Sequence, residues 1–123
     1  MTPASLEALA RALARLEPKT FTVYASSVFD YMLFATVDSN VNRPMICSSK
    51  DGTIKDAALF GAVWRCALRH SMAISVVCPI GQPAYVRCEG WDDRQEPVFI
   101  LDNQIGVALA LAYCAARGDK VEF

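Results

Sequence analysis

The segment IGVALALAYCAA, residues 105–116, decides how this chain must fold, because it contains twelve consecutive residues without a charge. A helix that is apolar on every side has no face suited to water, so protein must cover it all round. The segment is too short to cross a bilayer, which takes about 20 apolar residues. We therefore predict a buried helix that is enclosed either by the rest of this chain or by a second subunit.

Composition predicts one folded domain over residues 1–123. Apolar residues make up 54% of the chain and charged residues 20%, which is richer in apolar groups than an average globular domain. Such an excess favours a homodimer or a bound protein partner. The 12 basic and 13 acidic residues nearly balance, which disfavours nucleic-acid binding. A local cluster of Arg65, Arg69, Arg87 and Arg94 is the exception that the sequence leaves open.

The sequence favours a cytoplasmic protein. Glu7, Arg11 and Arg15 interrupt the apolar pattern near the N-terminus, so it does not read as a secretory signal, and no apolar segment is long enough to span a membrane. The chain has five cysteines, an odd number, all in or beside apolar runs. We expect reduced thiols that pack as small buried hydrophobic groups. They are Cys47, Cys66, Cys78, Cys88 and Cys114.

The first part of the chain predicts one helix followed by two or three strands. Thr2 and Pro3 are a favourable helix start, and Pro18 marks its end. Between them a leucine at every third or fourth position predicts one buried stripe (Leu6, Leu9, Leu13 and Leu16). Alternating or continuous apolar residues then predict extended segments over 20–25 and 28–37, which form either a tight hairpin or one bent strand, with a short third strand over 45–47.

The second part predicts a helix, a hairpin, a further strand and the uncharged helix. Thr53 caps the first of these helices, Asp56 can reach back to it in a capping box, and the helix runs to about His70. Strands over 72–78 and 84–90 flank the turn sequence PIGQP, and another strand covers 97–101. We expect Asp102 to cap the last helix and Gly118 to close it.

This order predicts an α+β fold, a single domain in which a mostly antiparallel sheet of about five strands packs with three helices. Small residues on two helices permit close approach, either within one chain or across a dimer axis. They are Ala57, Ala58, Gly61 and Ala62 on one helix, and Gly106 and Ala110 on the other.

The polar segment EGWDDRQE, residues 89–96, is the predicted partner-binding site. Trp91 lies among four acids, and an exposed tryptophan is a frequent anchor in protein interfaces. Acidic neighbours would attract a protein partner with a basic surface. The alternative is that Trp91 folds back over the sheet as part of the core. The predicted binding residues are Glu89, Trp91, Asp92, Asp93 and Glu96.

The competing hypothesis is a zinc- or cysteine-dependent module or enzyme. Cys66 and His70 are four residues apart on a predicted helix, and Cys78 and Cys88 flank the predicted hairpin. However, no Cys-x2-Cys pair and no Cys–His catalytic signature is present, and burial would suppress thiol reactivity. We therefore expect no metal, no cofactor and no enzymatic activity.

The tail ALALAYCAARGDKVEF, residues 108–123, resembles the ends of short accessory proteins of temperate phages, in which an alanine-rich helix precedes a Gly-Asp-x-Val-Glu segment. The resemblance covers fewer than twenty residues and implies a small phage or mobile-element product. The sequence thus predicts a non-enzymatic interaction module, an inhibitor or accessory protein that binds a host protein stoichiometrically.

Overall fold

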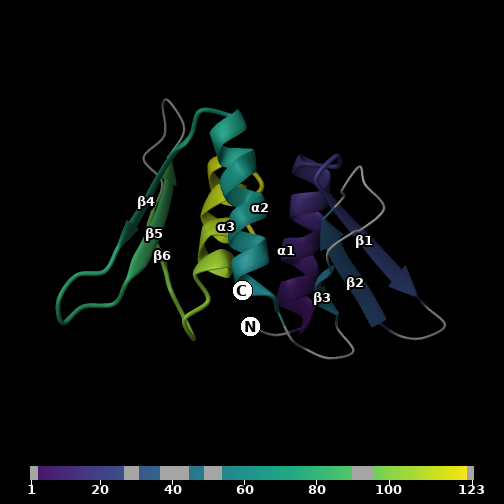
Figure 1. Cartoon of the computed structure of the whole chain (residues 1–123), viewed down its shortest axis with the longest axis horizontal. Helices are drawn as coiled ribbons and strands as arrows, with labels where there is room; N and C mark the ends of the chain where they lie inside the picture. The colour runs from purple at the N-terminus through teal and green to yellow at the C-terminus, as the bar shows by residue number, and fades with distance from the viewer. Residues whose placement is uncertain (1–2, 27–30, 37–44, 49–53, 90–95, 122–123) are drawn as a thin grey trace. The chain divides into compact units, whose positions relative to one another are not determined.

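The computed structural model describes residues 3–26, 31–36, 45–48, 54–89 and 96–121. The chain forms two compact units, unit 1 (Met1–Lys55 with Val121–Phe123) and unit 2 (Asp56–Lys120). The described ranges contain three helices and six strands (Figure 1): α1 (Pro3–Leu16), β1 (Phe21–Ser26), β2 (Tyr31–Thr36), β3 (Met45–Ser48), α2 (Asp56–Arg69), β4 (Ala73–Val77), β5 (Tyr85–Glu89), β6 (Val98–Phe99) and α3 (Ile105–Ala116).

Unit 1 consists of α1 and an antiparallel sheet in the order β1-β2-β3. The helix contacts β1, and the predicted leucine stripe is its buried side: Leu9 and Leu13 are at most 1% exposed. Arg11 and Arg15 lie on the exposed side. The helix ends two residues before Pro18, as the missing N–H of proline requires.

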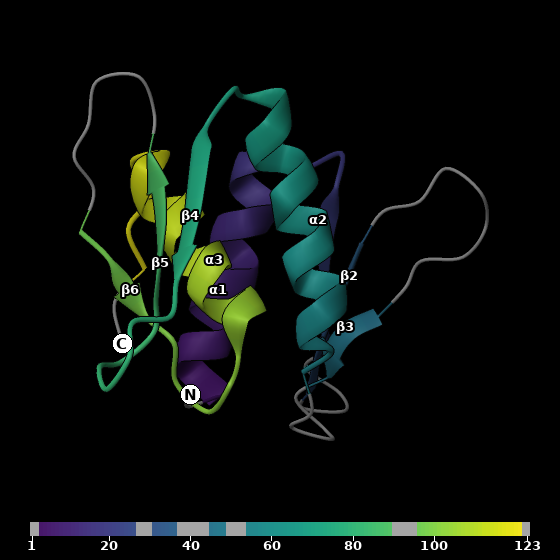
Figure 2. The ribbon, with the colours of Figure 1, turned by 60° about the vertical axis from the view of Figure 1, so that its left-hand side comes forward.

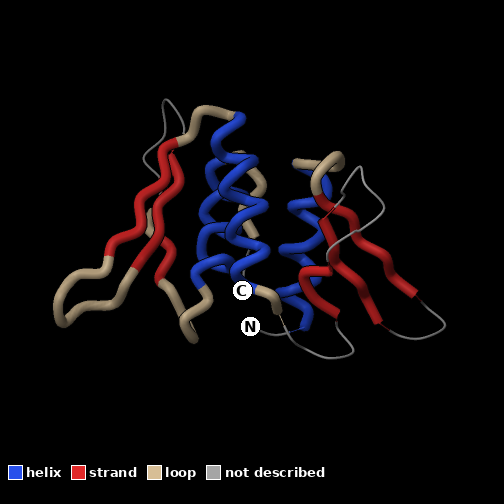
Figure 3. The backbone as a smooth tube through the Cα atoms, viewed as in Figure 1, coloured by secondary structure: helices blue, strands red, loops and turns tan. Residues whose placement is uncertain are grey.

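Unit 2 has three layers, with α3 in the middle. The sheet β4-β5-β6 packs on one side of α3 through β5 and β6, and α2 packs on the other side. Figures 1 and 2 show this order, and Figure 3 shows the strands of unit 2 on one side of its two helices. Eight of the twelve residues of α3 are buried. The rest of the chain therefore encloses the uncharged helix, one of the two outcomes that its sequence predicts.

The N-terminal cap of α3 comes from α2, and the prediction that Asp102 supplies it is wrong. Gln104 occupies the N-cap position without a side-chain hydrogen bond, and Asp102 has a positive φ of 54°. Instead, the two carboxylate oxygens of Asp56 accept hydrogen bonds from the backbone N–H groups of Gly106 (2.9 Å) and Val107 (3.0 Å). Because Asp56 is the first residue of α2, the N-termini of α2 and α3 lie together.

Gly106 allows this close approach. A Cβ atom at this position would collide with the backbone carbonyl oxygen of Asp56 and would lie 2.9 Å from the backbone nitrogen of Phe60. By contrast, a Cβ on Gly61 of α2 would meet nothing within 4 Å, and Ala57 and Ala58 are exposed. The predicted close approach within one chain is thus confirmed at Gly106, whereas most of the small-residue patch on α2 faces away from it.

Both helices of unit 2 end in the same backbone motif. In α3, Gly118 has a φ of 85°, and the N–H of Asp119 donates to the carbonyl oxygen of Cys114 at 2.9 Å. This is the pattern that predicted Gly118 as the closing residue. In α2 the equivalent left-handed position is Ser71, with a φ of 54°. The turn that follows leads directly into β4.

The α+β class, the antiparallel pairing and the three helices are confirmed. The strands, however, are divided between two three-stranded sheets rather than joined in one sheet of about five; among the described strands no pairing links β1–β3 with β4–β6. The helix α1 carries an apolar face that covers the strands of unit 1, and α3 covers the strands of unit 2. The assignment of residues 1–123 to a single domain remains a prediction.

Candidate protein-binding surface

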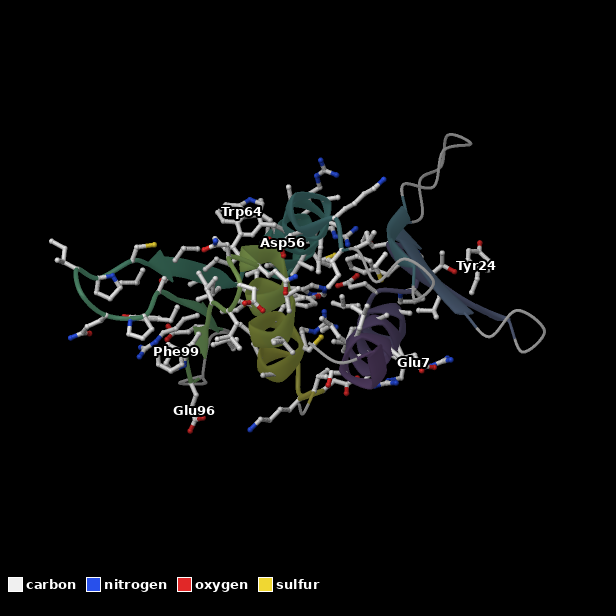
Figure 4. The ribbon with its side chains drawn as sticks, turned by 90° about the horizontal axis from the view of Figure 1, so that it is seen from below. Glu7, Tyr24, Asp56, Trp64, Glu96 and Phe99 are labelled. Atoms are coloured by element: carbon white, nitrogen blue, oxygen red, sulfur yellow. The ribbon has the colours of Figure 1, made fainter. Side chains whose placement is uncertain are left out.

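The predicted acidic binding segment connects β5 and β6. Glu89 is the last residue of β5, and Glu96 is exposed shortly before β6. Figure 4 shows Glu96 and Phe99 at the outer side of the sheet. Trp91, Asp92 and Asp93 lie outside the described residues, so both interpretations of Trp91 stay open.

The face of the sheet that points away from α3 carries aromatic and cationic side chains. Tyr85 of β5 is directly opposite Phe99 of β6, and their rings are 6.3 Å apart in an edge-on arrangement at 75°. The guanidinium of Arg87 lies 5.5 Å from the centre of the Tyr85 ring, a cation–π contact. The alternate residues Val86 and Cys88 are fully buried, as the two-residue period of a strand requires.

Two strongly exposed aliphatic side chains border this face. Ile80 is at the tip of the β4–β5 hairpin and is 102% exposed, and Leu101 follows β6 and is 72% exposed. The N–H of Ile100 donates to the carbonyl of Ala84 at 2.9 Å, which holds the segment after β6 beside the hairpin. We refer to these outer residues as the sheet surface: Ile80, Tyr85, Arg87, Phe99 and Leu101.

Exposed apolar side chains are concentrated in unit 2. Among the side chains that the structure describes, seven large hydrophobic ones are exposed, and six of them belong to this unit. Only Tyr24, at 44%, belongs to unit 1. These six side chains belong to α2, to β4, to the hairpin tip and to β6 with the segment after it, so more than one surface of unit 2 carries exposed apolar groups.

The residues of the zinc hypothesis do not come together. Cys66 and His70 are neighbours on α2, whereas Cys88 is paired with Ile74, four residues and therefore about 13 Å along the strand from Cys78. Across the described part of the chain, no three His, Cys, Asp or Glu side chains are grouped closely enough to hold a metal ion.

His70 instead joins the C-terminal ends of the two parallel helices. Arg117 donates from one guanidinium nitrogen to Nε2 of His70 (2.9 Å) and to the hydroxyl of Tyr113 (2.6 Å). Because a guanidinium has no acceptor, the Nε2 atom of His70 is the acceptor of this hydrogen bond. In the last turns of α2, the Cys66 thiol accepts a hydrogen bond from the Arg69 guanidinium (3.2 Å). This arrangement connects helices and presents no open ligand position.

The buried thiols are poorly suited to nucleophilic catalysis. Burial raises the pKa of Cys47 to about 11, and burial together with the charge of Glu89 raises that of Cys88 to about 11. A thiol with such a pKa is almost entirely protonated at neutral pH, and the thiolate is the nucleophile. Cys78 departs from the prediction of buried cysteines because it is exposed after the end of β4.

A shallow depression of about 540 Å³ in unit 1 offers no acid–base pair either. It lies between the end of α1 and β1, and the lining residues that the structure describes include no carboxylate, histidine or thiol. Arg11 in this lining forms an ion pair with Glu7 at 2.8 Å. The lining residues are Arg11, Ala14, Arg15, Pro18, Phe21, Thr22 and Val23.

The arginines that could have formed a nucleic-acid site are not on one face. Arg65 and Arg69 are exposed on α2, whereas Arg87 is on the outer face of the sheet, with α3 between these two layers. Arg94 lies outside the described residues. None of the helices within the described ranges is long and apolar enough to cross a membrane.

Comparison of the chain with protein-family models, with curated proteins and with solved structures finds no match. The function must therefore be inferred from the surface itself.

Sequence reasoning missed the sheet surface, although one signal for it was present. Residues 71–86 contain no charged side chain, and this uncharged run is longer than the buried helix at residues 105–116. Much of that run is exposed in the structure. A strand pattern predicts that alternate residues share a face but does not say whether a second layer covers that face.

Proposed function

We propose that this chain is a non-enzymatic protein-interaction module that binds another protein stoichiometrically through the sheet surface. The observation that carries the proposal is the group of half-buried Tyr85 with exposed Arg87 and Phe99 on the outer face of the sheet. Tyrosine and arginine are enriched among interface residues that dominate binding energy, and Phe99 adds a half-exposed aromatic ring. Ile80 and Leu101 extend the apolar area on its border.

The acidic segment adds a preference for partner charge to this proposal. Glu89 and Glu96 flank the stretch that contains Asp92 and Asp93, so the chain carries four acids from the end of β5 to the start of β6. A partner with an apolar patch bordered by basic residues would satisfy both features. Together with the phage-like tail, this composition leads us to propose an inhibitor or accessory protein that acts on a host protein.

The test compares two exposed aromatic residues as bait variants. A tagged chain is used to capture partners, and the affinity of a captured partner is then measured with purified proteins. Phe99→Ala should weaken that affinity by about 30-fold or more, or about 2 kcal/mol, because a central aromatic residue is lost from the interface. Tyr24→Ala, which removes an exposed aromatic ring from unit 1, should leave the affinity unchanged.

Equal affinities for wild type and Phe99→Ala, with the fold intact by circular dichroism, would contradict the sheet surface as the binding site. A Trp91→Ala variant tests the acidic segment separately. Loss of binding in this variant would support Trp91 as an anchor, and unchanged affinity would contradict that role.

A further inference from the structure

The β4 strand is an edge strand without the usual protection. It pairs with β5 on one side, and within the described strands nothing pairs with its other side. Natural proteins protect such edges with charged residues, proline or short length. At the opposite edge, β6 has two residues and follows Glu96 and Pro97. In contrast, β4 has the sequence AISVV, which contains no charge and no proline and in which three of the five residues are β-branched.

Apolar side chains of α2 lie beside this edge. Trp64 is 38% and Leu68 is 58% exposed, and they occupy successive turns on one side of the helix. Phe60 precedes them by one turn, with its ring 5.7 Å from that of Trp64. Since α2 contacts β4 and Figure 4 shows Trp64 on the side of α2 towards the sheet, this row continues the apolar edge. We refer to the combined area as the edge surface: Trp64, Leu68, Ile74, Ser75 and Val76.

We propose that the edge surface binds a second copy of this chain, with the two β4 strands paired antiparallel about Ser75. In this register Ile74 of each copy is opposite Val76 of the other, and the two Ser75 side chains face each other across the twofold axis. The strand is thus complementary to itself. A twofold interface requires this self-complementarity, because the same patch is used by both subunits.

The charge distribution favours a second copy over a charged partner. The uncharged run 71–86 covers the whole strand and the hairpin tip. In the antiparallel register the paired residues are those of β4, Ala73–Val77, and none of them is charged, so no like charges meet across the paired strands. A partner with a basic or acidic strand would find no counter-charge along this edge, and its charges would lose water without compensation.

The expected interface also uses the helix row. A stable interface buries about 800 Å² per partner, more than a five-residue strand supplies, so Trp64 and Leu68 must contribute. The dimer would contain one continuous six-stranded sheet and would display two copies of the sheet surface on the same face. This inference goes beyond the proposed function, since it concerns a different surface and holds whether or not the sheet surface binds a partner.

The first experiment measures solution mass by light scattering for the full chain and for charge variants at Ser75. The wild type should have twice the 13.5 kDa mass of one chain. Ser75→Glu should be monomeric, because it opposes two carboxylates at the axis. Within one chain the same substitution is opposite Arg87, so the fold should be preserved. Ser75→Lys is opposite Arg87 within its own chain and should lower its stability slightly, but mixing the folded Ser75→Lys variant with Ser75→Glu should restore the dimer as a heterodimer.

The control variant is Ala58→Glu, which adds the same charge to an exposed position on another face of α2 and should remain dimeric. A wild type that is monomeric up to about 100 µM, where even an interface with micromolar Kd is largely filled, would overturn the proposal. So would a dimer that Ser75→Glu leaves intact.

A covalent test gives a second, independent readout. Ser75→Cys in a Cys78→Ser background should form a disulfide-linked dimer under mild oxidation, because directly opposite residues of antiparallel strands are close enough for the bond. The Cys78→Ser background alone should not cross-link, since its remaining cysteines are buried. Failure to cross-link would contradict the register. Loss of partner binding in Phe99→Ala with the dimer intact would separate the two surfaces.

Discussion

Both units begin with a helix followed by three antiparallel strands, but unit 2 adds the helix α3, and the units differ in which helix covers the sheet. In unit 1 the helix that precedes the strands, α1, packs on its own sheet. In unit 2 the equivalent helix, α2, packs mainly on α3, and α3 covers the sheet. The difference follows from the helix sequences. An amphipathic helix needs one partner layer, whereas a helix that is apolar all round needs a layer on each side.

The layered arrangement of unit 2 has a consequence for its surface. Because α3 lies between α2 and the sheet, α2 forms an outer layer of unit 2, and its side chains Trp64 and Leu68 are exposed. The sheet keeps one face for α3 and leaves the face with Tyr85 and Phe99 uncovered. The position of α3 in the middle layer therefore accounts for the exposure of both the sheet surface and the edge surface.

The largest expected effect comes from breaking the contact between α2 and α3. Gly106→Ala should destabilise the protein by about 2–4 kcal/mol, because the added methyl group collides with the Asp56 backbone and displaces the cap. The free energy of unfolding in urea measures this loss.

A matched substitution on the facing helix should have the opposite sign. Gly61→Ala adds the same methyl group where nothing lies within 4 Å, so the higher helix propensity of alanine should stabilise the protein by about 0.5–1 kcal/mol. Equal effects of Gly106→Ala and Gly61→Ala would show that the helices do not approach each other at Gly106.

A smaller effect is expected from the cap alone. Asp56→Ala removes both hydrogen bonds to the start of α3 and should cost about 1–2 kcal/mol, since two N–H groups lose their acceptor. Asp102→Gly is the control and should change stability by less than about 0.5 kcal/mol, because the side chain is exposed and glycine accepts the positive φ of 54° at this position. A larger loss in Asp102→Gly than in Asp56→Ala would restore the local cap that the sequence predicts.

The remaining expected effect is the alkaline titration of one buried thiol in each unit. Burial raises the pKa of Cys47 and Cys88 to about 11 from an ordinary value of 9.0. Between these values the unfolded chain releases protons that the folded chain keeps, so stability should fall as pH rises from 9 to 11.

Denaturation at pH 7.5 and pH 10 measures this titration. Cys88→Ala and Cys47→Ala should each reduce the loss of stability between the two pH values, because each removes one titrating group. Replacement of the exposed Cys78 by alanine is the matched control. A loss of the same size in all four proteins would show that neither thiol is shielded from water.

Local sequence signals predicted the elements well, and long-range contacts account for the errors. The turn PIGQP correctly predicted the hairpin of β4 and β5, and Gly118 correctly predicted the end of α3, because a turn or a helix end depends on a few adjacent residues. Asp102 failed as a cap because the competing acceptor, Asp56, is fifty residues away from Gly106 in the chain.

The candidate site was predicted less completely than the fold. The sequence directed attention to Glu89 and Glu96, because charge and tryptophan are visible in any sequence. The sequence predicts a strand at Phe99 and a turn at Ile80, but the residues next to them do not indicate whether another layer covers these side chains. Likewise, the sequence offers a possible zinc-ligand set, but the strand register separates two of its members, Cys78 and Cys88. The full set is Cys66, His70, Cys78 and Cys88.

The sequence by itself determined the α+β class, the antiparallel hairpin and the burial of the helix at residues 105–116, since each follows from periodicity, turn residues or the absence of charge within a short segment. Only the tertiary structure decided that α2 runs parallel to α3, that Asp56 caps its neighbour, and that the strands divide into two sheets. These features depend on which distant segments meet. That choice is made by the complementarity of whole faces, which no short segment contains.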